Sequence, residues 1–187
     1  MATVINAQTS AGGLSITPDL SGQIALQSNG TTVATITPTG MTTQVGAPAF
    51  SVQNNGTAQS VSNQTWTKVA LNTKQFDTNT NFDAVTNYRF TPTVAGYYQF
   101  SSFVSGPSNS TQNQITALYK NGTLYNYLGA VQNLNASAVV NDGVSGSILI
   151  SLNGSTDYVE LWVYQQTGST VNTAGYAYLT GFLARSA

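Results

Sequence analysis

Carboxylates are the groups in this sequence that could carry catalytic chemistry, because it contains no histidine and no cysteine. The absence of histidine and cysteine excludes Ser-His and Cys-His nucleophilic catalysis and the usual zinc ligand sets. Glycoside hydrolysis requires two carboxyl groups about 5–10 Å apart. The candidate pairs are Asp77 with Asp83 and Asp157 with Glu160.

Neither pair predicts an active site. Asp157 and Glu160 are three residues apart on an expected strand, which directs them to opposite faces. Asp77 and Asp83 lie in the stretch FDTNTNFD, where carboxylates typically cap turns. Calcium binding by this stretch is an alternative, since it offers several oxygens, but it lacks a full ligand set. We therefore predict no enzymatic activity and no cofactor, with calcium as the alternative.

The composition predicts an all-β protein. Only 6% of the 187 residues are charged, whereas 78 are Ser, Thr, Asn or Gln. The hydrophobic fraction of 41%, with 10 Tyr, 7 Phe and 2 Trp, is sufficient for a core. Thr, Tyr and Val favour strands, and Gly and Asn favour turns.

The charges and the N-terminus exclude several classes of partner. Five Lys and Arg against six Asp and Glu cannot form a basic patch, so we expect no nucleic-acid binding. No apolar run approaches the roughly 20 residues of a membrane helix, so we expect no membrane insertion. The first residues, MATVINAQTS, do not form a secretory signal.

Residues 1–46 differ from the rest, since they contain no aromatic residue and one charged side chain, Asp19. Within them, SGQIALQSNGTTVATITPTG predicts a β-hairpin, because Asn-Gly suits a two-residue turn with positive φ. A lone hairpin is marginal in water. We expect it to pack on the rest of the chain, on sister chains or on a larger assembly; a flexible tail is the alternative. The predicted anchor residues are Ile24, Leu26, Asn29, Gly30, Val33 and Ile36.

Gly46 and Pro48 mark the junction to a second domain, residues 47–187. Short alternating runs separated by turns at about 8–12-residue spacing predict a β-sandwich or jelly roll there. The predicted core comprises Phe50, Phe90, Tyr98, Phe100, Ile148, Ile150, Leu161, Val163 and Leu179.

The expected strand at residues 158–164 has large side chains on both faces. This favours contact of the second face with another sheet or subunit. A central sandwich strand with an aromatic outer face is the alternative.

The chain from Pro48 to its end resembles the globular head of the complement component 1q family, a relative of tumour necrosis factor. The resemblance rests on PAFSV, NYRFTPTVAGYYQF, ALYKNG, GVSGSILISLNGSTDYVELWV and YLTGFLA, in this order over about 140 residues. Each motif is weak alone, but five in order are fairly specific. Leu179 replaces the family's closing Phe, and no collagen-like Gly-x-y repeat precedes Pro48, which disfavours an immune or hormone role.

The resemblance implies a jelly-roll β-sandwich and a homotrimer around a three-fold axis. In such a fold, the loop from Pro92 to Gly96 would direct Tyr98 and Phe100 into the core. Aromatic side chains would line the subunit contacts, and Tyr158, Trp162 and Tyr164 are the candidates.

The segment GGLSITPDLSGQIALQSNGTT resembles N-terminal pieces of tailed-bacteriophage fibre and virion proteins. The sequence therefore predicts a structural protein on the virion surface, made in the host cytoplasm. It would be a homotrimer bound to another virion protein through residues 1–46. Residues 1–46 would be the anchor and residues 47–187 the globular head, which we call the knob. Capsid decoration or a head fibre is favoured, because an anchor joined directly to a knob leaves no shaft to reach a distant receptor. The alternative is a tail fibre or tail tip that attaches to a host surface glycan.

Overall fold

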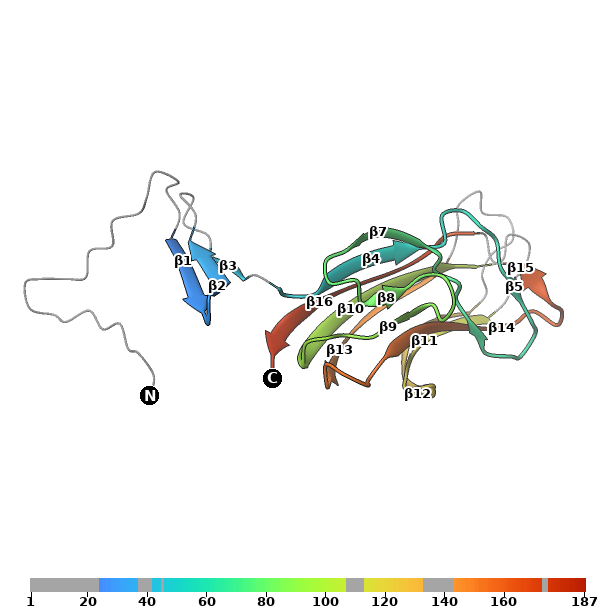
Figure 1. The fold of residues 1–187 in the computed structure, drawn as a ribbon. Coiled ribbons are helices and arrows are strands. Elements are labelled where there is room, and N and C mark those ends of the chain that lie inside the picture. Colours follow the sequence, from blue (N-terminus) through green and yellow to red (C-terminus); the bar gives the residue numbers. More distant parts are fainter. Residues whose placement is uncertain (1–23, 37–41, 45, 107–112, 133–142, 173–174) are drawn as a thin grey trace, which may run out of the picture. The chain divides into compact units, whose positions relative to one another are not determined.

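The computed structural model divides the chain into two compact units, Met1–Gly46 and Ala47–Ala187. The division lies at the junction that Gly46 and Pro48 mark in the sequence. Within the described residues every element is a strand, and none forms a helix that could cross a membrane. The structure describes residues 24–36, 42–44, 46–106, 113–132, 143–172 and 175–187 (Figure 1).

The first unit contains a three-stranded antiparallel sheet in the order β1 (Ile24–Ser28), β2 (Thr31–Ile36) and β3 (Thr42–Gln44). The predicted hairpin is present as β1 and β2, and Asn29 and Gly30 adopt positive φ angles of 49° and 77° at its turn. The third strand was not predicted, because three polar residues carry no alternation of apolar side chains.

The second unit is a β-sandwich of two antiparallel sheets (Figure 1). The five-stranded sheet has the order β13-β10-β16-β4-β7. Its strands are β4 (Ala49–Gln53), β7 (Thr73–Asp77), β10 (Gly96–Ser105), β13 (Gly143–Leu152) and β16 (Ala177–Ser186).

The six-stranded sheet has the order β12-β11-β14-β9-β8, and β6 also pairs with β14. A separate two-stranded pair joins β15 to β5. The bounds are β5 (Ser60–Val61), β6 (Thr67–Lys68), β8 (Phe82–Asp83), β9 (Arg89–Phe90), β11 (Asn113–Lys120), β12 (Thr123–Val131), β14 (Val159–Gln166) and β15 (Val171–Asn172).

A cluster of aromatic rings lies between the two sheets, surrounded by buried Val, Leu and Ile side chains. Phe50 of the five-stranded sheet stacks on Phe90 of the six-stranded sheet, with ring centroids 4.4 Å apart. The Phe100 ring lies 6.0 Å from that of Phe50 and 5.8 Å from that of Phe90. Of the predicted core, Ile148 is only partly buried and packs against this cluster. The fully buried members are Phe50, Phe90, Tyr98, Phe100, Ile150, Leu161, Val163 and Leu179.

Tyr98 brings one polar group into this core. Its hydroxyl donates a hydrogen bond of 2.6 Å to the carbonyl of Val94. Burial raises the pKa of Tyr98 to about 12, because the charged phenolate is poorly solvated there. The hydrogen bond also fixes the loop between Pro92 and Gly96 to the strand that follows it.

We expect Phe100→Ala to lower the free energy of unfolding by about 3–5 kcal/mol, because it leaves a cavity among stacked rings. Phe76→Ala is the matched control, since the Phe76 side chain is 52% exposed. The control should cost less than about 1 kcal/mol. Chemical denaturation of both variants measures the difference, and equal losses would contradict the assignment of Phe100 to the core.

Candidate functional site

The acidic residues that could carry chemistry are engaged within the chain. The described residues contain no group of three or more His, Cys, Asp or Glu that could hold a metal ion. The stretch 76–83 contains the end of β7, a turn and the whole of β8. Asp77 accepts hydrogen bonds from the N–H groups of Asn81 and Phe82, at 3.0 and 2.9 Å. Its carboxylate therefore caps the turn between these strands.

Asp83 caps the next turn. Its carboxylate accepts hydrogen bonds from the N–H groups of Thr86, Val85 and Asn87, at 3.0, 2.9 and 3.2 Å. The Asn87 side chain adds a further bond of 2.6 Å. These donors, with Thr86 contributing most, hold the pKa of Asp83 well below its ordinary value. A stably ionised carboxylate of this kind organises a loop.

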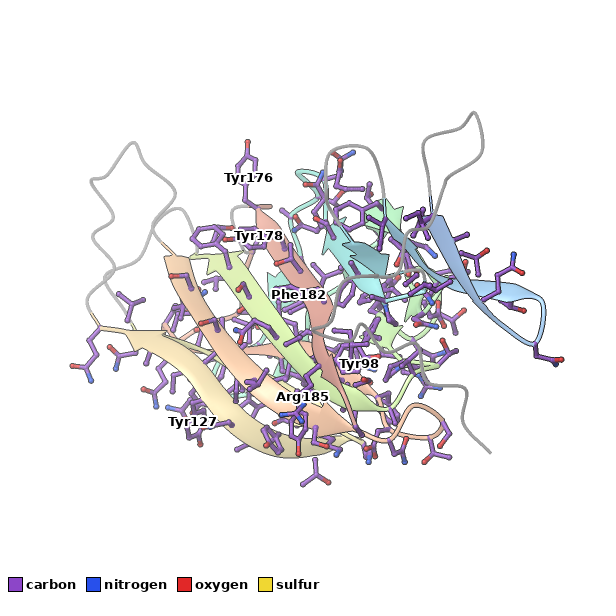
Figure 2. All side chains as sticks on the ribbon, turned by 90° about the vertical axis from the view of Figure 1, so that its left-hand side faces the viewer. Tyr98, Tyr127, Tyr176, Tyr178, Phe182 and Arg185 are labelled. Atoms are coloured by element: carbon purple, nitrogen blue, oxygen red, sulfur yellow. The ribbon has the colours of Figure 1, made fainter. Side chains whose placement is uncertain are left out.

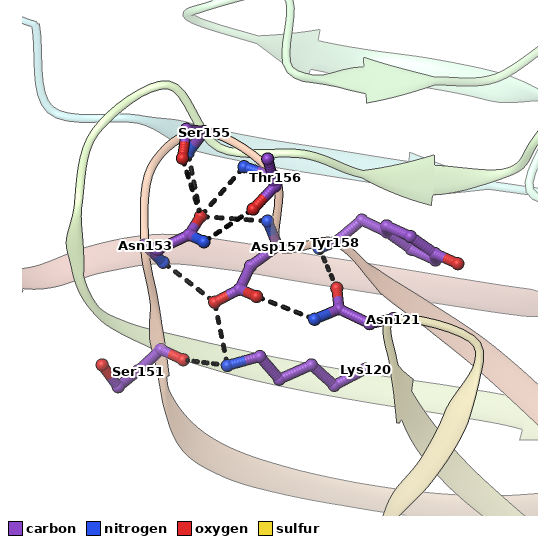
Figure 3. Close-up of polar contacts among 8 residues, drawn as sticks. All are labelled: Lys120, Asn121, Ser151, Asn153, Ser155, Thr156, Asp157 and Tyr158. Atoms are coloured by element: carbon purple, nitrogen blue, oxygen red, sulfur yellow. Dashed lines mark hydrogen bonds and ion pairs between the residues drawn. The ribbon is translucent and has the colours of Figure 1, made fainter.

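Asp157 fastens the β11–β12 hairpin turn to the loop that connects β13 with β14 (Figure 3). It accepts a hydrogen bond from the side chain of Asn121 at 2.8 Å and pairs with Lys120 at 2.9 Å. Its other contact is with the N–H of Asn153, at 3.0 Å. The Asn121 side chain, followed by Lys120, lowers the pKa of Asp157. The other acidic candidate, Glu160, is buried and pairs with Lys68 at 2.6 Å.

The side chains predicted to form a trimer contact are half-buried: Tyr158, Trp162 and Tyr164. Trp162 stacks on Tyr119 with ring centroids 4.5 Å apart, and Tyr164 lies 5.3 Å from Trp66. The Arg89 guanidinium lies 4.4 Å from the ring of Tyr158. These contacts account for large side chains on the second face of β14 without a neighbouring subunit. Their role in a trimer remains a prediction.

More exposed apolar side chains lie on the outer face of the five-stranded sheet. Phe182, Leu149 and Tyr97 are 53%, 52% and 46% exposed. Gln99 of β10 pairs with Leu149 of β13 on one side and with Phe182 of β16 on the other. Leu149 and Phe182 therefore lie in one row across these three strands. Figure 2 shows Phe182 on β16, between Tyr178 and Arg185. We call Tyr97, Leu149 and Phe182 the exposed sheet face.

A second exposed apolar surface lies along β12, an edge strand of the six-stranded sheet. Tyr127, Tyr125 and Leu124 are 58%, 48% and 37% exposed. We call these three residues the β12 edge. A strand at a sheet edge with exposed apolar side chains is typically a site of association.

The sheet of the first unit also has an apolar face. Ile24 pairs with Ile36 and Leu26 pairs with Ala34, so these four side chains project from the same side. Leu26 is 44% exposed and Ile36 is 37% exposed. Asn29 and Gly30 form the turn of this hairpin, and the side chain of Val33 lies outside the described residues.

Sequence reasoning missed the exposed sheet face, although a signal was present. Tyr97, Leu149 and Phe182 are bulky residues at solvent-side positions of strands whose other positions are apolar. The same signal was recognised only for residues 158–164. Which of these bulky side chains contact other residues of the chain depends on how strands that are distant in the sequence pair with one another.

Comparisons with known proteins confirm the jelly-roll β-sandwich. No protein-family model and no curated protein matches the sequence. The fold is similar to PRD1 vertex protein P5, with a TM-score of 0.56, 16% identity and coverage of 74% of this chain and 97% of that one. It is also similar to murine APRIL, with a TM-score of 0.50, 10% identity and coverage of 73% and 99%. At these identities the likeness establishes the fold alone.

We expect Asp157→Asn to destabilise the fold by about 1 kcal/mol at pH 7, because the neutral amide loses charge-assisted bonds. The folded pKa of Asp157 lies below its ordinary value of 3.8. The ionised carboxylate therefore stabilises the fold above that value, and this contribution is lost as pH falls through the folded pKa.

Denaturation of the wild type and Asp157→Asn at neutral pH and at about pH 2 tests this expectation. The difference between them should shrink at the acidic end. A difference that stays constant with pH would show that the charge of Asp157 is unimportant.

Proposed function

We propose that this chain is a non-enzymatic structural protein on the surface of a bacteriophage particle. It forms a homotrimer that is attached by its N-terminal segment and exposes the jelly-roll knob as a capsid decoration or head fibre. The observation that carries the proposal is the division into a small sheet with an apolar face and a knob with the fold of PRD1 vertex protein P5. The resemblance of residues 1–46 to virion proteins supports the same role.

Attachment is assigned to the first unit because its sheet is small and apolar on one side. A sheet of three short strands has little core of its own. Covering the exposed side chains of Leu26 and Ile36 would remove apolar surface from water, which favours association. The partner in this proposal is another virion protein.

Trimer formation is assigned to the exposed sheet face and the β12 edge. They lie on different strands of the same knob, so contact between them joins one copy to the next in a head-to-tail manner. Such contacts form a ring when the rotation between copies closes. Aromatic side chains such as Tyr97, Tyr125 and Phe182 are enriched at protein interfaces. The resemblance to trimeric heads of the complement 1q type sets the expected number of copies at three.

The alternative function is a tail fibre or tail tip that binds a carbohydrate on the host. The exposed tyrosines of the knob favour this alternative, because their rings combine apolar faces with hydroxyl groups. Immunogold electron microscopy of intact particles distinguishes the two functions. Label over the head supports decoration or a head fibre, and label confined to the tail supports receptor binding. Particles without label would contradict both.

We expect Phe182→Asp to convert the trimer into monomers, because it would bury an unpaired carboxylate in an apolar contact. Multi-angle light scattering after size exclusion measures the mass. Val85→Asp is the matched control, since Val85 is 82% exposed and outside both surfaces. The control should remain trimeric.

Tyr164→Asp in the same experiment tests the contact predicted from sequence. Retention of the trimer in Tyr164→Asp, together with monomers from Phe182→Asp, would assign the contact to the exposed sheet face. Monomers from Tyr164→Asp together with trimers from Phe182→Asp would reverse this assignment.

Removal of residues 1–46 should leave a folded, trimeric knob that no longer joins particles. The knob retains its own core, whereas the apolar face of the first unit is lost. Sedimentation of particles assembled with the truncated or the full chain, followed by immunoblotting, measures incorporation. Incorporation of the truncated chain at the level of the full chain would rule out the anchor assignment.

A further inference from the structure

A small pocket lies where the end of β4 meets the beginning of β16. It has a volume of about 160 Å³. Figure 2 shows Tyr176 and Tyr178 at one end of β16, with Arg185 at the other. The pocket is lined by Gln53, Asn54, Asn55, Gly56, Tyr176, Ala177 and Tyr178.

The floor of this pocket is held in place by backbone and amide bonds. Asn54 is buried, and its side-chain oxygen accepts a hydrogen bond of 2.9 Å from the N–H of Ala177. Its side-chain nitrogen donates to the carbonyl of Thr57 at 3.0 Å. The backbone N–H of Asn54 donates to the carbonyl of Ala177 at 3.1 Å. These bonds tie the two walls together, so the pocket is formed before any ligand arrives.

Close backbone packing strengthens the same corner. Gly175 has a φ of 85°, and a Cβ there would lie 2.6 Å from the carbonyl oxygen of Gly56. Asn55 and Gly56 form a turn with φ angles of 48° and 79°. Glycine at 175 is therefore required for the two segments to approach this closely.

The rim offers neutral hydrogen-bonding groups. Gln53 and Asn55 are joined by a long bond of 3.4 Å between their side chains. Each primary amide carries two N–H donors and an oxygen with two lone pairs, so this bond uses a small part of their capacity. The rest is available to a ligand that carries several hydroxyl groups.

Two aromatic rings complete the lining. Tyr176 is 55% exposed and Tyr178 is 41% exposed. The Tyr178 ring packs against that of Phe103, with centroids 6.0 Å apart, which holds it in position. An aromatic face beside amide groups suits a ligand with apolar C–H surfaces and hydroxyl edges. A pyranose ring has this combination.

The charge and size of the pocket further restrict which sugars could bind. No lining residue is charged, so an anionic sugar would find no counter-ion and would lose hydration without compensation. The volume is below the range of about 300–1,000 Å³ that is typical of pockets for drug-sized ligands. One sugar ring, as the terminal unit of a longer glycan, matches these limits.

We propose that this pocket binds a neutral pyranose unit. This inference goes beyond the proposed structural role and does not depend on attachment to a particle or on trimer formation. Sugar binding can therefore be absent while the trimer forms, and it can occur while the trimer does not form. The mass of each sample, measured in parallel, shows whether the trimer is present and so distinguishes the two failures.

Saturation-transfer difference NMR on the full chain tests the proposal. The probes are the methyl pyranosides of glucose, galactose and mannose, with N-acetylglucosamine, and the anionic probes are glucuronate and N-acetylneuraminate. We expect binding of at least one neutral probe with a Kd of roughly millimolar order. Tyr176→Ala and Gln53→Ala should each weaken it by about tenfold, since each removes one side of the pocket.

Phe76→Ala is the control variant, because Phe76 has an exposure of 52%, close to that of Tyr176, and lies on β7, outside the pocket lining. It should bind like the wild type. The proposal is overturned if no neutral probe binds, if an anionic probe binds more tightly, or if both pocket variants bind like the wild type.

Discussion

The stacking of Phe50 on Phe90 between the two sheets is the contact on which the knob depends. Its rings join strands that are far apart in the sequence. Gly181 makes this packing feasible, because a Cβ there would lie 2.7 Å from the Phe100 ring and 2.8 Å from that of Phe50. Glycine in the centre of β16 therefore gives the core rings space that any other residue would fill.

This core also determines what the knob presents to its surroundings. Side chains alternate between the faces of a strand, so a register that directs Tyr98 and Phe100 inward directs Tyr97 outward. In the same way, Leu179 faces the core while Tyr178 is exposed. The packing that stabilises the sandwich thus determines which positions face outward, and the sequence places Tyr97, Leu149 and Phe182 at three of them.

The sandwich and most of its core could be predicted from sequence, because long strands such as β10 and β13 carry a clear two-residue period. The Asn29-Gly30 hairpin was predictable for a similar reason, since its turn chemistry is local. Two-residue strands such as β6 and β8 carry no period. The partners of Trp162 were also beyond sequence reasoning, because Tyr119 reaches it only through the pairing of β11 with β14.

The scarcity of charge explains where interactions can occur. Lys68, Lys74 and Lys120 form ion pairs with Glu160, Asp77 and Asp157 inside the knob. These pairs fasten strands and turns, and they leave the exposed sheet face, the β12 edge and the pocket lined mainly by apolar and amide groups. The contacts proposed for these surfaces would rely on apolar burial and neutral hydrogen bonds, which salt screens much less than it screens charge pairs. Such contacts would therefore persist over a wide range of ionic strength.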